Sequence, residues 1–101
     1  MSWTESDSSV ASKSEVKRPG RYRVILLNDD YTTMEFVILI LVEIFRKTQE
    51  EAVAVMLEVH KKGRGVAGIY SKEIAETKVD EVHKKARENE FPLRCTIEKV
   101  S

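Results

Sequence analysis

The order of the hydrophobic patterns along the chain is the feature that most restricts its fold. Three short stretches of β-type character are separated by stretches of helical periodicity, in the order β-α-α-β-α-β. A doubly wound parallel sheet needs regular alternation of strands and helices, and this order does not provide it. The pattern predicts an α+β fold with a three-stranded antiparallel sheet and three helices packed largely on one face.

The three predicted strands differ in how fully their residues are expected to be buried. Residues 21–28 are apolar and β-branched on much of both faces, which is typical of a central strand. Residues 65–70 contain two glycines, which allow another backbone or side chain to approach closely. Residues 93–98 alternate apolar and polar side chains, so we expect a half-exposed last strand.

Polar capping residues mark the starts of the predicted helices. Thr32 and Glu35 have the spacing of a capping box, as do Thr48 and Glu51, and Ser71 is the expected cap of the third helix. The first helix is expected to run to about residue 46 and is apolar almost all round. It is therefore either nearly buried or presents one face to a partner. The candidates for such a face are Ile38, Ile40 and Ile44.

The second and third helices each carry a single apolar stripe. In the second helix the stripe consists of Ala52, Val55, Met56 and Val59. His60 continues this stripe, and Gly63 is a plausible C-terminal stop. In the third helix the stripe consists of Ala75, Val79, Val82 and Ala86. His83 lies among the charged residues of the opposite face, so we expect it to be exposed.

Composition limits the domain organisation and the class of partner. The 101 residues make one domain, which we divide into a flexible N-terminal tail, residues 1–20, and a folded core, residues 21–101. Seventeen basic and seventeen acidic residues give zero formal charge, which argues against binding to nucleic acid. The longest apolar run, residues 36–42, is too short to cross a membrane. The single cysteine, Cys95, indicates the reducing cytoplasm and is expected to be a small core residue.

The junction between the first strand and the first helix holds Asn28, Asp29 and Asp30. Side chains alternate in an extended chain, so Asn28 and Asp30 should share a side while Asp29 points away. That divergence argues against a catalytic pair of carboxylates, and the three residues could also form a plain turn.

Residues 63–68 match the letters of the G-x-G-x-x-G dinucleotide motif. Here they follow a helix and lead into a strand, whereas a dinucleotide site follows a strand and opens a helix, so the match is accidental.

Asn28, Asp30 and a neutral His60 would together suit an ammonium group. An ammonium has three donors and no acceptor, so it needs several converging acceptors. Met34 and Met56 would offer an adjoining pocket for a large apolar side chain, since methionine adapts to aromatic rings. A free peptide N-terminus fits both requirements, provided that the two helices bring these residues together.

The chain also resembles a known family over nearly all of residues 22–100. The resemblance is carried by the motifs at residues 28–36, 56–60, 75–79, 92–96 and 98–99. They are similar to those of the bacterial ClpS adaptor, which delivers proteins with N-terminal Phe, Tyr, Trp or Leu to the ATP-dependent ClpA–ClpP protease. The resemblance implies a cytoplasmic adaptor with no catalytic residues, no metal and no cofactor.

The resemblance also implies a set of site residues. Asn28, Asp30 and His60 would hold the substrate α-amino group, with Asp29 near the peptide backbone at the mouth. The side-chain pocket would be lined by Leu26, Leu27, Thr32, Met34, Val37, Met56, Val59 and Leu93. Glu73 and Lys78 would face the N-terminal domain of a ClpA-type AAA+ ATPase, and the tail would be engaged during handover.

Three positions depart from the family pattern. Thr33 replaces a usual proline, which is expected to loosen the turn before the first helix without removing a contact group. Ala67 replaces a common cysteine and Phe91 a common histidine, and neither belongs to the recognition set.

Two other functions fit parts of the same sequence. The first is a small metal-dependent hydrolase that uses Asp29, Asp30 and His60. The second is a plain interaction module that binds another protein through the apolar first helix, without regard to peptide N-termini.

Overall fold

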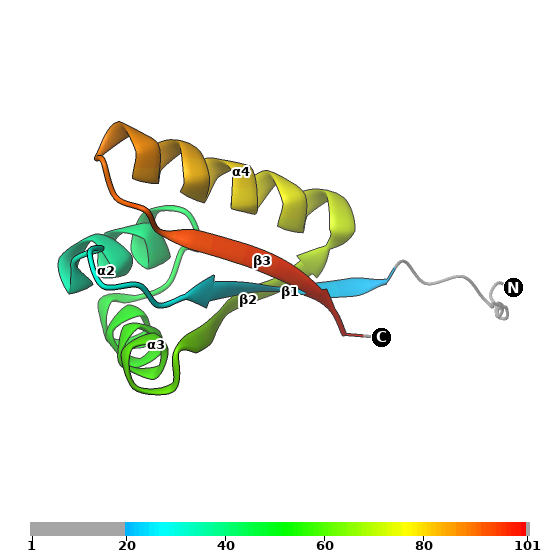
Figure 1. Ribbon diagram of the computed structural model, residues 1–101. Coiled ribbons are helices and arrows are strands. Elements are labelled where there is room, and N and C mark those ends of the chain that lie inside the picture. Colours follow the sequence, from blue (N-terminus) through cyan, green and yellow to red (C-terminus); the bar gives the residue numbers. More distant parts are fainter. Residues whose placement is uncertain (1–19, 101) are drawn as a thin grey trace, which may run out of the picture.

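The computed structural model describes residues 20–100, so the predicted tail lies almost entirely outside the described residues. Figure 1 shows three strands and three helices in this part of the chain. They are β1 (Arg21–Leu27), α2 (Met34–Glu43), α3 (Gln49–Lys62), β2 (Arg64–Ser71), α4 (Lys72–Glu88) and β3 (Arg94–Lys99). The predicted order of elements is therefore confirmed.

The strands form one antiparallel sheet in the order β2-β1-β3, so the first strand is central as predicted. Its middle residues Val24, Ile25 and Leu26 are at most 1% exposed. Leu27, the last residue of β1, lies opposite Arg64 on one neighbour and Arg94 on the other. The end of β1 is thus flanked on both sides by the starts of other strands.

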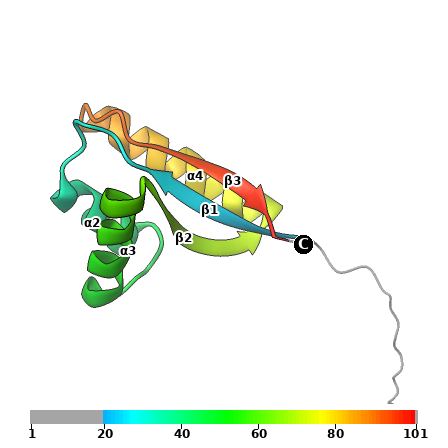
Figure 2. The same ribbon diagram turned by 60° about the horizontal axis from the view of Figure 1, so that its bottom comes forward.

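The helices divide into two groups around the sheet. α4 covers one face of the sheet, while α2 and α3 pack together at the end where β1 finishes (Figures 1 and 2). Toward the solvent, Arg23 and Arg64 hold Glu98 at 2.8 and 3.0 Å. This arrangement leaves the α2–α3 end free to form a site with the residues that follow β1.

The start of α2 differs from the prediction. The N-cap is Thr33, whose Oγ1 accepts the Phe36 N–H at 3.1 Å, and the capping box predicted on Thr32 is wrong. The hydroxyl of Thr32 instead donates to Asp29, a charged and therefore stronger acceptor than the available backbone groups. The Thr33 side chain supplies the cap of α2, and the expected loosening of this turn stays a prediction.

The rest of α2 settles the choice left open by its composition. The helix ends at Glu43, three residues before the predicted boundary. Ile40 and Leu41 are fully buried, Ile44 is 9% exposed and Ile38 is half-buried, so the candidate face is covered, whereas Met34 and Leu39 of the same helix are exposed.

The caps of α3 and α4 follow the sequence signals. Thr48 and Glu51 form the predicted reciprocal capping box, with bonds of 2.9 and 3.1 Å. Gly63 ends α3 with a φ of 87°, a left-handed conformation that favours glycine. The Ser71 side chain accepts the Ile74 N–H at the start of α4. These local signals were sufficient because each bond joins residues close in sequence.

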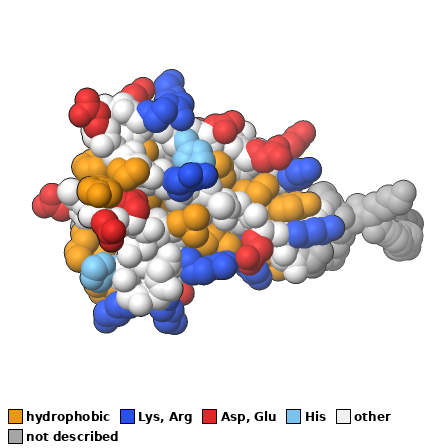
Figure 3. All heavy atoms as spheres, in the orientation of Figure 1, with side chains coloured by type: hydrophobic (Ala, Val, Ile, Leu, Met, Phe, Trp, Pro, Cys, Tyr) orange, Lys and Arg blue, Asp and Glu red, His pale blue; other side chains and the backbone are white. Residues whose placement is uncertain are grey.

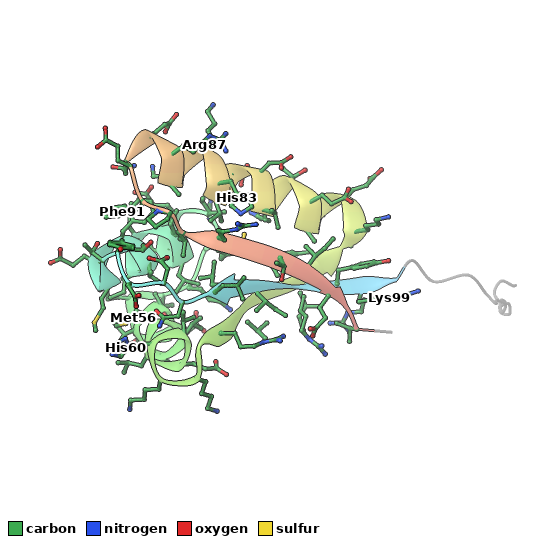
Figure 4. The ribbon with its side chains drawn as sticks, in the orientation of Figure 1. Met56, His60, His83, Arg87, Phe91 and Lys99 are labelled. Carbon is green, nitrogen blue, oxygen red and sulfur yellow. The ribbon has the colours of Figure 1, made fainter. Side chains whose placement is uncertain are left out.

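Cys95 and His83 meet between α4 and β3. Cys95 is buried as predicted, and burial, followed by the nearby charge of Asp80, raises the pKa of its thiol to about 12. His83 is half-buried, so the prediction that it is exposed is wrong. Its Nε2 accepts the Cys95 N–H at 3.1 Å, and Figure 4 shows it pointing from α4 toward β3. Here a tertiary contact outweighs the helical pattern.

Candidate functional site

A cavity of about 250 Å³ lies where the loop after β1 meets α2 and α3. Its walls are formed by Asn28, Asp29, Asp30, Thr32, Met34, Val37, Met56, Val59 and His60. Met56 and His60 lie on α3 beside that loop (Figure 4). The structure therefore brings together the three residues predicted to hold an amino group and five of the eight predicted for the side-chain pocket.

The loop between β1 and α2 is organised by the carboxylate of Asp29. Its Oδ1 accepts the backbone N–H groups of Tyr31 and Thr32 at 2.8 and 2.7 Å. Its Oδ2 accepts the Thr32 hydroxyl at 2.7 Å. Both oxygens of Asp29 are therefore occupied within the loop, although the residue also borders the cavity.

The pKa of Asp29 agrees with its role in holding the loop between β1 and α2. Partial burial raises its pKa, but the hydrogen bonds from Thr32 and Tyr31 favour the ionised form and outweigh the burial. The net pKa of Asp29 lies below its ordinary value of 3.8. At neutral pH the carboxylate is charged and holds the loop.

The loop is tied to α3 through the backbone. The Asn28 N–H donates to the Gly63 carbonyl at 3.0 Å, at the point where Gly63 ends α3. His60 lies in the last turn of the same helix. This bond brings Asn28 beside the turn that carries His60, which explains how polar groups distant in sequence reach one cavity.

The apolar part of the cavity has a buried floor and an exposed rim. Val37, Met56 and Val59 are 3–7% exposed, whereas Met34 is 47% exposed. A Cβ on Gly65 would lie 2.8 Å from Val59 Cγ2, so this glycine allows β2 to pack directly behind the floor. At the end of the molecule that holds α2 and α3, Figure 3 shows hydrophobic side chains interleaved with acidic ones and a histidine.

Three residues predicted for the side-chain pocket do not line this cavity. Leu26 is fully buried in the central strand and belongs to the core. Leu27 lines a smaller cavity of about 130 Å³, and Leu93 lines another beneath α4. That these three residues touch a bound side chain stays a prediction.

Glu73 and Lys78 both lie on α4, away from the cavity. Glu73 is exposed in the first turn of the helix. Lys78 is half-buried, and its Nζ donates to the Ile44 carbonyl at 2.7 Å while lying 5.8 Å from the centre of the Tyr70 ring. Lys78 thus places a cation at the C-terminus of α2, which has no basic residue in its own last turn. No pattern in the sequence indicates this contact.

The described residues offer little support for the metal-dependent hydrolase. Within residues 20–100, no group of three or more His, Cys, Asp or Glu side chains is arranged to hold a metal ion. Asp29, one of the proposed ligands, already uses both oxygens in the loop.

Among residues 20–100, no helix has the length and apolar character needed to span a bilayer.

Comparisons with known proteins agree on one family. Residues 17–96 match the family model described as ATP-dependent Clp protease adaptor protein ClpS. The ATP-dependent Clp protease adapter protein ClpS of Oleidesulfovibrio alaskensis is 54% identical over 97 residues, covering 96% of this chain and 93% of the relative. That of Lawsonia intracellularis is 54% identical over 96 residues, covering 95% and 88%.

A solved structure is similar in both sequence and fold. Agrobacterium tumefaciens ClpS2 bound to L-phenylalaninamide has 41% sequence identity and a TM-score of 0.78. The alignment covers 81% of this chain and 99% of that one. The ligand in that structure has a free α-amino group and a benzyl side chain.

Proposed function

Because the chain belongs to the ClpS family of Clp protease adaptors, we propose that it binds proteins by their first residue and delivers them to a Clp ATPase–protease. The substrates are proteins with a free α-amino group and a first residue of Phe, Tyr, Trp or Leu. The observation that carries the proposal is one cavity in which Asn28, Asp30 and His60 border an apolar floor. A related protein binds L-phenylalaninamide, which combines both chemical features.

The polar part of the cavity suits an ammonium group. The Asp30 carboxylate supplies charge, and the Asn28 side-chain oxygen and a neutral His60 nitrogen supply further acceptors. All three side chains are exposed at the cavity before ligand binds, so an incoming amino group displaces water rather than an existing bond. Asp29 holds the loop through its carboxylate and lies near the peptide backbone at the mouth.

The apolar part selects the first side chain. Val37, Met56 and Val59 form the floor, and the exposed Met34 closes over the bound side chain from the rim. Burying a large apolar side chain against these residues stabilises the complex by about 1.5–3 kcal/mol. A small first residue such as Ala leaves that gain unrealised.

The test is a fluorescence-anisotropy titration with peptides that begin with Phe and differ only in whether the N-terminus is free or acetylated. Acetylation removes the charge and two donors, so we expect a loss of about a hundredfold, the usual effect of breaking a charged, desolvated hydrogen bond. Asp30→Asn should weaken binding of the free peptide. Asp80→Asn, at an exposed position on α4 outside the cavity, is the matched control and should bind normally.

Equal binding of free and acetylated peptides would overturn the proposal. It would favour the plain interaction module, for which Leu39, exposed on α2, is a test position. A loss of binding on chelation would instead favour the hydrolase. The adaptor is expected to bind without metal and to leave the peptide uncleaved.

Delivery is a separate step from binding and uses a different surface. We assign Glu73 to the contact with the N-terminal domain of a ClpA-type ATPase. Glu73→Lys should abolish delivery of a Phe-initiated substrate in a reconstituted degradation assay while leaving peptide affinity unchanged. Lys78 is a poorer test position, because its substitution also removes the bond to the Ile44 carbonyl. The free Cys95 fits the reducing cytoplasm as the site of action.

A further inference from the structure

A second, smaller cavity adjoins the proposed amino-group site. Its volume is about 130 Å³, and Leu27, Asn28, Asp29, Pro92 and Arg94 line it. Asn28 and Asp29 also line the main cavity, so the two hollows share a wall. The smaller cavity thus lies next to the place proposed for the first residue of a peptide, with Arg94 among its lining residues.

Arg94 is placed at this cavity by the sheet. It is the first residue of β3 and pairs with Leu27, the residue just before Asn28. Arg94 is exposed, and no ion pair involves it among residues 20–100. By contrast, Arg23 and Arg64 of the same sheet both hold Glu98. Arg94 thus presents a guanidinium without an ion-pair partner among the described residues, at a cavity that Asp29 also lines.

We infer that the cavity between Asp29 and Arg94 is a subsite for the residues that directly follow the substrate's first residue, and that Arg94 favours a carboxylate there. The inference rests on the proposed function, since it needs a peptide anchored by its N-terminus. Asp29 and Asp30 repel an acidic side chain close to the anchored amino group. Arg94 lies on the far side of Asp29 and offsets that repulsion by offering a bidentate donor.

A double-mutant cycle isolates this contribution. Peptides that begin with Phe carry either Glu or Gln at position two, or at position three, and are titrated against the wild type and Arg94→Gln. The ratio of Glu to Gln affinity should be about two- to fivefold higher in the wild type at one of these positions, the effect of an exposed ion pair. Arg94→Lys should keep part of the effect, and about 1 M salt should suppress it.

The matched control is Arg87→Gln. Arg87 is exposed on α4 and lines the next cavity, which includes Pro92 and Arg94 but not Asn28 or Asp29. Its substitution should leave the Glu-to-Gln ratio unchanged. A ratio that changes equally in both variants would point to the general surface potential and overturn the subsite.

The outcomes also separate this inference from the proposed function. If the Gln peptides bind the wild type and lose affinity on acetylation, the amino-group site stands. Within that result, an unchanged Glu-to-Gln ratio in Arg94→Gln at both positions overturns the subsite alone. If no Phe-initiated peptide binds, the proposed function itself fails. Unchanged affinity of Arg94→Gln for the Gln peptides shows that the variant is folded.

Discussion

Substitution of Asp29 tests whether this carboxylate acts mainly by holding the loop after β1. Asp29→Ala removes all three hydrogen bonds that it accepts, from two backbone N–H groups and from the Thr32 hydroxyl. Asp29→Asn keeps an oxygen for the two N–H groups but loses the charge and the acceptor for the hydroxyl. Thr32→Val removes the hydroxyl from the other side of the same bond.

The expected magnitudes follow from the burial of the three bonds. A hydrogen bond to a charged group contributes about 1.5–3 kcal/mol. The two bonds from Thr32 are partly buried and the bond from Tyr31 is exposed, so water replaces the third most easily. We therefore expect Asp29→Ala to lower the free energy of unfolding by about 3 kcal/mol, and Asp29→Asn and Thr32→Val each by about 1 kcal/mol. Because the last two remove the same bond, their effects should not add.

Urea unfolding at neutral pH measures the stability of each variant, and anisotropy measures its affinity for a Phe-initiated peptide. In the wild type the pKa of Asp29 is lowered by folding, so its contribution is present above 3.8 and is lost as the pH falls through the lower, folded value. Asp29→Asn should remove this part of the acid sensitivity.

An Asp29→Ala variant that unfolds like the wild type, with only its peptide affinity reduced, would refute this expectation. That result would make Asp29 a direct peptide contact and not a support for the loop. Thr32→Ser, which keeps the hydroxyl, is the control and should resemble the wild type in both measurements.

Three further predictions concern the packing and the caps. Gly65→Ala places a methyl group 2.8 Å from Val59 Cγ2, so it should displace the cavity floor and weaken peptide binding more than it lowers stability, as anisotropy and urea unfolding would show. Normal affinity would mean that β2 absorbs the change. The pKa of the Cys95 thiol is raised from its ordinary 9.0 to about 12, so the thiol should resist alkylation at neutral pH until the protein unfolds. For the same reason the free energy of unfolding should fall as the pH rises above about 9. Rapid labelling of the native protein would contradict the burial of Cys95. Thr33→Ala should lower the free energy of unfolding by about 1 kcal/mol through loss of the cap. Thr33→Pro should recover part of that loss, because the φ of −73° at this residue suits a proline ring, and a larger loss than for alanine would refute the fit.

The sequence predicted those features that depend on residues close together in the chain. The capping box of Thr48 and Glu51 and the stop at Gly63 are of this kind, and each is present in the structure. The order of apolar patterns was likewise sufficient for the fold class, since few arrangements bury three short strands and three amphipathic helices.

Features that depend on competition between partners were not predictable in the same way. Thr32 and Thr33 can both cap α2, and only the structure shows that Asp29 takes the hydroxyl of the first. The polar pattern of α4 likewise hid the bond between His83 and the Cys95 N–H. The pairing of Asn28 with His60 was inferred from the number of acceptors that an ammonium group requires. The cavity beside Arg94, by contrast, had no counterpart in any sequence pattern.

The bond from the Asn28 N–H to the Gly63 carbonyl has a consequence for how this family of sites can evolve. It joins the two halves of the cavity through main-chain atoms alone, so changes to the surrounding side chains leave it in place. Only the conformation at Gly63, with its φ of 87°, restricts which residues are tolerated there. Under the proposed function, the spacing assigned to an amino group can therefore persist while Met34, Met56 and Val59 vary, and a lineage can change which first residue it accepts without rebuilding the part assigned to the chain end.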